Sequence, residues 1–285
     1  MRTLRSTTNR AGAPGGAAPS RRRWRSAVLA AAAAAALAAG AAAEEATILF
    51  HGLAEGGVWL GVQQGFDEAT VLARFAGRDL GLLTEPPAGT PPVAVIAAVP
   101  PAELAELAAA WQERGVAVLD VLSAGDDDPR RPCRPNLLHV APSAAMKRDA
   151  LAQWRRLHPA DDAEARAWHP AFLKFSATEL NSRFRERHGR PMDDDAWAGW
   201  AAVKMVAEAV VRSGSAEPRP VLDYLRAEMA FDGVKGIPLS FRSDGQLRQP
   251  VLIVVGDRPV GEAPVAGVAD PEDLDSLGEE PACGG

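Results

Sequence analysis

Several kinds of reactive residue are scarce in this sequence of 285 residues. It has two cysteines, too few for a disulfide-dense mini-domain, and five histidines. No histidine has a His or Cys partner at metal-ligand spacing, and the H-E-x-x-H motif is absent. The sequence therefore predicts no metal site at its scattered histidines, which are His51, His139, His158, His169 and His188.

The motifs of common enzyme classes are missing as well. There is no G-x-S-x-G nucleophile elbow, no G-x-x-x-x-G-K-[ST] phosphate loop and no G-x-G-x-x-G dinucleotide loop. The glycines at 56, 57, 61 and 65 have another spacing and indicate a loop followed by a helix start. The acidic runs 126–128 and 193–195 lack the ligand spacing of a calcium loop, so they indicate a solvated loop and a helix N-terminus. We expect no cofactor and a binding protein that is not an enzyme.

Charge of one sign is concentrated at the start of the chain. Residues 1–43 contain seven arginines and no acid, which leaves 24 basic against 37 acidic residues, a net charge of −13, in the remainder. An acidic body disfavours nucleic acid as a partner. Glycine and proline together make up about 17% and apolar residues 47% of the chain, which excludes collagen, wholly disordered and multi-span membrane proteins.

The first 43 residues have the layout of a secretory signal peptide. Basic residues 21–25 precede an apolar run at 27–39, and small residues at 40–43 follow it. The run is too short to span a bilayer. We expect cleavage before Glu44 and a periplasmic location, with the Sec and Tat routes both open; the alternative is an Ala-rich disordered leader. In that oxidising compartment Cys133 and Cys283 could form a disulfide, or they are two unrelated thiols.

The pattern after the leader alternates between strands and helices. Helical spacing predicts helices over 60–75, 102–114 and 144–157, the last capped by Ser143. The strands expected between them have apolar runs that suit burial on both faces, at 46–50, 80–84, 92–99, 116–122 and 136–140. This alternation predicts an α/β fold in which helices flank a parallel sheet, with a first lobe over 44–157.

The second half is more helical. Helices are expected over 172–188, 196–212 and 221–229, and Trp197 and Trp200 on the second of them are expected in the core. Strands are expected over 231–240 and 249–255, joined by a turn at 243–245, so that 158–255 supplies helices and closing strands. Residues 256–285 are rich in glycine, proline and acids, which predicts an extended or disordered tail.

Several segments resemble one known family. Residues 232–241 (DGVKGIPLSF) and 243–251 (SDGQLRQPV) resemble the closing hairpin of type I periplasmic solute-binding proteins, the Leu/Ile/Val-binding type that serves ABC importers. Residues 184–211 resemble the late helix pair of that family. The stretches 133–154 and 270–283 are similar to a subfamily associated with PQQ-dependent alcohol dehydrogenase systems.

The resemblance implies two α/β lobes, a ligand cleft between them, and closure that exposes a surface to the transporter. Where this family builds most of its second lobe, the sequence has only the eleven residues 158–168. A polar stretch of that length is not expected to supply strands or helices of its own. We therefore expect an incomplete second lobe.

Ligand-binding residues are expected at the carboxyl ends of the parallel strands. Ser123 and Ser143 lie there, and Ser143 also begins a helix whose N–H groups could hold an anion. The resemblance implies that such hydroxyl and N–H groups bind a ligand carboxylate. The alternatives are a turn role for Ser123, an N-cap role for Ser143, and a packed neutral side chain for His139 on the preceding strand.

Two functions of different classes follow. The first is an exported solute-binding component of an ABC transporter, linked to quinoprotein alcohol oxidation, whose partners are a small organic solute, the membrane subunits and a dehydrogenase. The second is a periplasmic interaction or assembly module for a quinoprotein dehydrogenase, which binds no solute.

Overall fold

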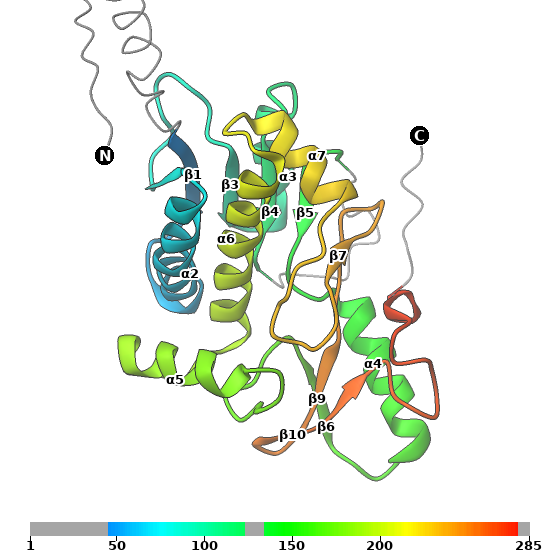
Figure 1. The fold of residues 1–285 in the computed structure, drawn as a ribbon. Coiled ribbons are helices and arrows are strands. Elements are labelled where there is room, and N and C mark those ends of the chain that lie inside the picture. The colour runs from blue at the N-terminus through cyan, green and yellow to red at the C-terminus, as the bar shows by residue number, and fades with distance from the viewer. Residues whose placement is uncertain (1–44, 123–133, 279–285) are drawn as a thin grey trace, which may run out of the picture. The chain divides into compact units, whose positions relative to one another are not determined.

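The structure is a computed structural model that describes residues 45–122 and 134–278 (Figure 1). These residues belong to one compact unit, Ala43–Gly285. The predicted signal peptide, Ser123 and both cysteines, Cys133 and Cys283, lie outside the described residues. Within the described part, no helix combines the length and the apolar character needed to cross a membrane.

A parallel sheet of five strands forms the centre of the first lobe. Its order is β2-β1-β3-β4-β5, and every neighbouring pair is parallel. The predicted parallel sheet of an α/β fold is confirmed. The strands are β1 (Glu45–Gly52), β2 (Asp79–Leu83), β3 (Ala94–Ala98), β4 (Ala117–Asp120) and β5 (Leu137–His139).

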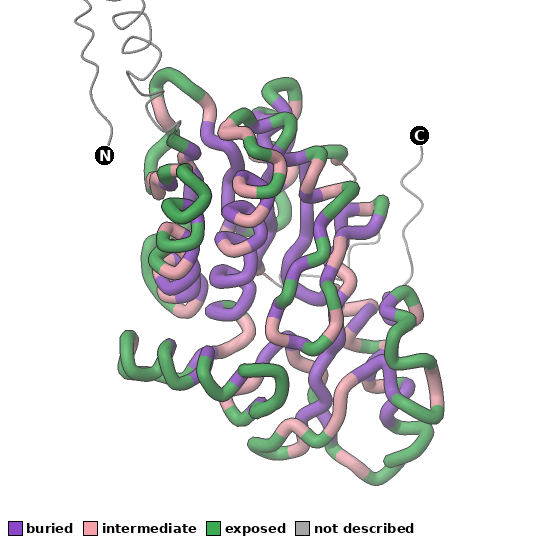
Figure 2. Tube along the Cα trace, in the orientation of Figure 1, coloured by how far each residue is buried: buried purple, intermediate pink, exposed green. Residues whose placement is uncertain are grey.

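Helices cover both faces of this sheet, which is why its central strands are apolar throughout. The main core joins one face to α2 (Gly56–Phe75), α6 (Asp194–Ser213) and α7 (Pro218–Ala227). A smaller core joins the other face to α3 (Pro101–Gln112). The strands and α6 are largely buried, whereas α5 (Ala177–His188) is mostly exposed (Figure 2). Trp197 and Trp200 lie in the core as predicted.

The two longest helices, α2 and α6, approach each other closely through glycine. A Cβ atom added at Gly61 would fall on the carbonyl oxygen of Ala196, and one at Gly65 would lie 2.8 Å from that of Trp200. Gly199 of α6 is pressed in the same way against the backbone of Val58. Helix α2 begins at Gly56, earlier than the expected start at residue 60. Its glycines were expected to mark a loop and a helix start, but they are contact positions inside the helix.

A second, antiparallel sheet has the order β10-β9-β6. Its strands are β6 (Ala163–Arg166), β9 (Val251–Val255) and β10 (Arg258–Ala263), and α4 (Ala144–Leu157) packs on one face. The prediction that 158–168 forms no element is wrong. This segment supplies β6, whose alanines at 163 and 165 alternate with Glu164 and Arg166 and whose backbone pairs with the apolar strand β9.

The C-terminal segment is ordered as far as the structure describes it. Its first part is β10, and residues 264–278, called the C-terminal strap here, run along α4 and include the 3-10 helix η1 (Leu274–Ser276). The Val265 N–H donates a hydrogen bond to the side-chain oxygen of Gln153 on α4, and the side-chain nitrogen of Gln153 donates one to the backbone carbonyl oxygen of Ser276. Of the two expected states of the tail, extended or disordered, disorder is wrong for 256–278, because backbone bonds and the buried Leu277 offset its polar composition.

The closing segment differs from expectation in its strands. Only Ser240–Phe241 (β7) and Leu247–Arg248 (β8) pair as a hairpin, around the predicted turn at 243–245. Phe231 and Leu239 form a single bridge, and the residues between them loop away from any sheet. That loop brings residues 233–238 to the second lobe, where they take part in the site described next.

Candidate functional site

The predicted strand-end residues have structural partners. Ser143 is the N-cap of α4, and its Oγ accepts a hydrogen bond from the Met146 N–H at 3.1 Å. His139 is 3% exposed, and its Nδ1 lies 2.9 Å from Oδ2 of Asp120 on the neighbouring strand. Ligand binding by Ser123, His139 and Ser143 stays a prediction.

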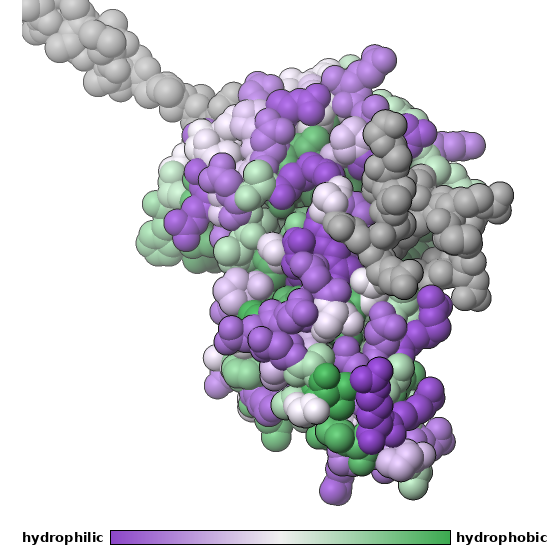
Figure 3. All heavy atoms as spheres, turned by 90° about the vertical axis from the view of Figure 1, so that its right-hand side faces the viewer, coloured by the Kyte–Doolittle hydropathy of each residue, from purple (hydrophilic) through white to green (hydrophobic). Residues whose placement is uncertain are grey.

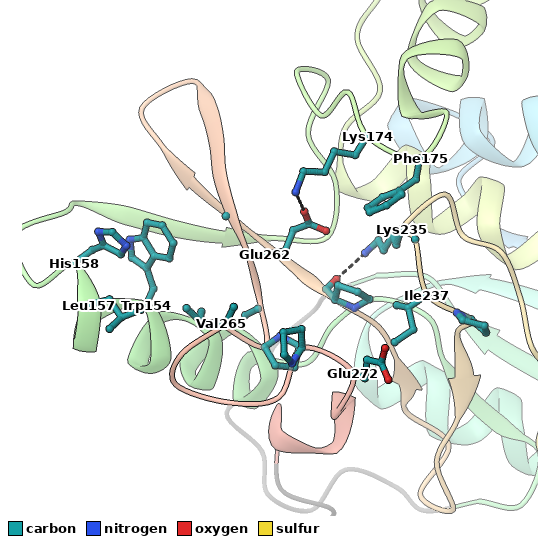
Figure 4. Close-up of a pocket in the computed structure, with 18 residues that line it drawn as sticks. Trp154, Leu157, His158, Lys174, Phe175, Lys235, Ile237, Glu262, Val265 and Glu272 are labelled. Carbon is teal, nitrogen blue, oxygen red and sulfur yellow. Dashed lines mark hydrogen bonds and ion pairs between the residues drawn. The ribbon is translucent and has the colours of Figure 1, made fainter.

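A cavity of about 810 Å³ lies elsewhere, against the second lobe (Figure 4). Four segments that are far apart in the sequence enclose it: the end of α4, the loop before α5, the loop at 235–238, and β10 with the C-terminal strap. Its volume is in the range of pockets that hold small molecules. Neither His139 nor Ser143 lines it; its apolar wall includes Leu157, Phe175, Ile237, Pro238, Pro250 and Val265.

Two aromatic rings of the wall pack directly on glycine backbone. Phe175 lies on Gly236, where a Cβ atom would overlap the ring, and Trp154 lies on Gly261, where a Cβ would come within 2.6 Å of it. Trp154 also stacks on His158 with ring centroids 3.9 Å apart. On the face that carries α4, hydrophobic atoms gather near the lower end and are bordered by hydrophilic ones (Figure 3). The cavity thus has apolar aromatic surfaces.

Backbone strain is concentrated at the cavity. Among the described residues, three non-glycine residues have a positive φ: Phe175 at 53°, Ser176 at 68° and Val234 at 60°. Such values are costly for bulky and β-branched residues, and they persist where the surrounding structure enforces them, often at ligand sites. All three lie in or beside the two loops that carry Lys174 and Lys235 into the wall.

Lys235 is a buried cation in this wall. It is 2% exposed, and its Nζ donates to Gln249 Oε1 at 2.7 Å and to Pro250 O at 3.1 Å. The same atom lies 4.0 Å from the centroid of the Trp197 ring. Its partners are neutral, since it forms no ion pair with a carboxylate of the described residues. Burial lowers the pKa of Lys235 to about 7.

The other charged groups of the wall have different surroundings. Lys174 Nζ lies 2.5 Å from Glu262 Oε1, and its side chain is 64% exposed. Figure 4 shows Glu262 between the two lysines, and Glu272 near Ile237. Glu272 lies on the exposed rim. Within the described ranges, no cluster of three or more His, Cys, Asp or Glu side chains could hold a metal ion.

The buried lysine predicts a specific pH dependence of stability. Between the folded pKa of about 7 and the ordinary value of 10.5, the unfolded chain binds a proton that the folded chain does not. The free energy of unfolding should therefore rise with pH in this window, by about 1.4 kcal/mol per pH unit, and the effect should vanish below it. Urea unfolding of the wild type and Lys235→Met at several pH values measures the difference in slope.

Lys174→Met is the matched control for that measurement. It removes a lysine from the same wall, but one that is exposed and paired with Glu262, so the slope of the wild type should be retained. Parallel pH profiles for the wild type and Lys235→Met would show that Lys235 does not titrate in this window.

The sequence contained one signal for this site. Lys235 stands between apolar residues in the stretch that resembles a known family, and it is followed by a glycine with φ 78°. Its burial could not be foreseen, because Trp197, Gln249 and Pro250 come from other segments. The cavity itself depends on the C-terminal strap, which was expected to be part of an extended or disordered tail.

Comparison with solved structures identifies the fold. A leucine-binding protein from Thermotoga maritima is 12% identical, with a TM-score of 0.57 over 75% of this chain and 96% of that chain. A periplasmic binding protein from Burkholderia mallei is 9% identical, with a TM-score of 0.64 over 82% and 96%. An ABC-transporter solute-binding protein from Rhodopseudomonas palustris, in complex with 3,4-dihydroxybenzoic acid, is 10% identical, with a TM-score of 0.58 over 76% and 94%.

The sequence comparisons are negative. No protein-family model matches the chain, and no curated protein matches it. At 9–12% identity the structural likeness establishes the fold, which is that of type I periplasmic binding proteins.

Proposed function

We propose that the chain is a periplasmic substrate-binding component of an ABC-type transporter, which captures a small organic solute without catalysis. The observation that carries this proposal is the cavity of about 810 Å³, walled by aromatic rings that pack on glycines and by loops held in strained conformations. The fold supports it, because the similar structures include ABC-transporter solute-binding proteins.

The finer parts of the proposal rest on sequence. The leader at 1–43 supports export, and the stretches 133–154 and 270–283 support a link to a PQQ-dependent alcohol dehydrogenase system. The expected partners are therefore transporter membrane subunits and a quinoprotein dehydrogenase. Ser123, His139 and Ser143 at the strand ends are the ligand-binding candidates that the sequence supplies, and a disulfide between Cys133 and Cys283 would fasten the C-terminus.

One observation favours the alternative, a non-transport interaction or assembly module. The second sheet has three described strands, and α4 is the helix packed on it. A small second lobe of this kind offers less surface for closure over a solute than a full α/β lobe would. If this alternative holds, the mature chain should bind a quinoprotein dehydrogenase in a pull-down and respond to no solute.

Thermal-shift and calorimetric titration of the mature chain test the proposal. A panel of alcohols, carboxylates, amino acids and quinone cofactor should contain a solute that stabilises the fold saturably, by about 2.7 kcal/mol at a concentration 100 times the Kd. Ile237→Trp, which places an indole in the cavity, should abolish this response. Leu72→Trp on the exposed side of α2 is the matched control and should leave it intact. Absence of any response, or turnover of a solute, would contradict the proposal.

A further inference from the structure

Lys235 is the one buried lysine of the described residues, and no carboxylate of the described residues forms an ion pair with it. Two hydrogen-bond acceptors and an aromatic face satisfy its donors, but these partners carry no formal charge. Removing an ammonium from water without a counter-ion is expensive, so buried charges are normally paired. This cation also forms part of the cavity wall, so a ligand in the cavity could provide the missing charge.

We propose that the cavity captures a small organic monoanion, whose carboxylate serves as the counter-ion of the buried Lys235 ammonium and whose apolar body lies against the aromatic wall. This inference rests on the proposed function and adds the class of solute. Lys174, on the strained loop beside the cavity, is paired with Glu262, so the charge that the carboxylate meets is that of Lys235. Phe175 and Ile237 provide the apolar surface beside these charges.

The acids near the cavity do not favour a cationic solute instead. Glu262 is half-buried but already paired with Lys174, so its charge is neutralised locally. Glu272 lies on the exposed rim, where water reduces its attraction for a cation to about 1 kcal/mol at contact distance. Lys235 acts from a site almost free of water, where the same charge interacts more strongly. The buried charge therefore decides the class of ligand.

Binding of an anion in the cavity is coupled to the protonation of Lys235. Burial lowers the pKa of Lys235 to about 7. The charge of Lys147 on α4 also lowers this pKa, whereas the charges of Asp194 on α6 and Glu262 on β10 raise it. A bound carboxylate favours the charged lysine and raises this pKa again. Above neutral pH the protein should therefore take up a proton as it binds the solute, and affinity should fall by about tenfold per pH unit.

Benzoate, benzamide and benzylamine make a suitable set of ligands, because they share a ring and differ in charge. Calorimetric titration of the mature chain at about pH 6 and about pH 8.5, in buffers of different ionisation enthalpy, counts the protons exchanged. We expect benzoate to bind at least about tenfold more tightly than benzamide. Benzoate should bind with uptake of close to one proton at the higher pH and almost none at the lower pH.

Variants separate the role of Lys235 from general folding effects. Lys235→Met should abolish benzoate binding, and Lys235→Arg, which stays charged, should bind without the pH dependence. Lys174→Met should weaken binding but keep the proton uptake. The wild-type proton count does not depend on any variant folding.

The outcomes distinguish this inference from the proposed function. Binding of benzamide, benzylamine or another uncharged or cationic solute in preference to carboxylates would overturn the inference and leave solute capture standing. Benzoate binding without proton uptake would overturn the role of Lys235. If no member of the solute panel binds at either pH, the proposed function itself fails.

Discussion

Replacing Gly61 by alanine should destabilise the fold by about 3 kcal/mol or more, although alanine is the better helix former. The added Cβ atom would overlap the carbonyl oxygen of Ala196, which belongs to the backbone of α6 and cannot rotate away. The helices would have to separate, and the packing of Val62 and Val203 in the main core would loosen along with them. The gain of about 1 kcal/mol in helix propensity is smaller than such overpacking costs.

Urea unfolding followed by circular dichroism measures this loss. Gly89→Ala is the matched control, because it makes the same substitution in a loop where nothing lies within 4 Å of the new Cβ atom, and it should change stability by less than about 0.5 kcal/mol. Gly65→Ala, with the Trp200 carbonyl oxygen at 2.8 Å, should fall between the two. Equal stability of Gly61→Ala and Gly89→Ala would show that the two helices do not touch through Gly61.

The elements that local rules could predict are those whose partners lie close by in the sequence. Continuous apolar runs predicted the strands of the parallel sheet, because such runs need cover on both faces. Ser143 and Asp193 were predicted to lie at helix starts, and both side chains accept a hydrogen bond from the first turn. The turn around Asp244-Gly245 was likewise predicted, although the strands that it joins, β7 and β8, are not those expected over 231–240 and 249–255.

The elements that were missed owe their structure to distant partners. A glycine occupies position 61 inside a helix because α6 leaves no room there for a side chain. The sequence pattern of α2 alone does not reveal this close approach. The strand β6 is short and polar in every second position, and it forms because β9 offers an apolar partner. The C-terminal strap was predicted to be extended or disordered from its acids, glycines and prolines, whereas side chains of α4 and of the hairpin form hydrogen bonds with its backbone.

The candidate site could not be predicted for the same reason. Ser123, His139 and Ser143 were chosen because they end parallel strands, a rule that applies to the sheet of the first lobe. The cavity is built instead from four loops and helix ends, and its buried lysine is recognisable only when Trp197 and Gln249 are seen around it. A function based on the cavity thus depends on the C-terminal strap, which supplies part of its wall.

Replacing Arg242 by methionine should therefore loosen the strap and open the cavity. The guanidinium of Arg242 is buried, and it donates to Asp275 Oδ1 at 2.8 Å and to the carbonyl oxygens of Leu274 at 2.9 Å and Leu277 at 2.6 Å. Methionine has a similar volume but no donors, so the buried residues Leu274 and Leu277 would lose this partner for their carbonyl oxygens, whereas Asp275, which is 57% exposed, would keep its bond from Arg248. The expected loss is about 3 to 5 kcal/mol, because two backbone carbonyl oxygens each lose a hydrogen bond from a charged donor, which is worth about 1.5 to 3 kcal/mol.

Arg248→Met is the matched control, because Arg248 donates to the same Asp275 oxygen from a more exposed position and leaves the strap carbonyls bonded to Arg242. It should cost about 1 kcal/mol or less. Hydrogen exchange locates the effect: the amides of Val265 and Gly278, which bond to Gln153 and Asp149 of α4, should lose protection in Arg242→Met and keep it in Arg248→Met. Equal protection in both variants would mean that α4 alone holds the strap. Loss of protection in Arg242→Met only, together with weaker solute binding by that variant, would show that Arg242 maintains the cavity wall through the strap.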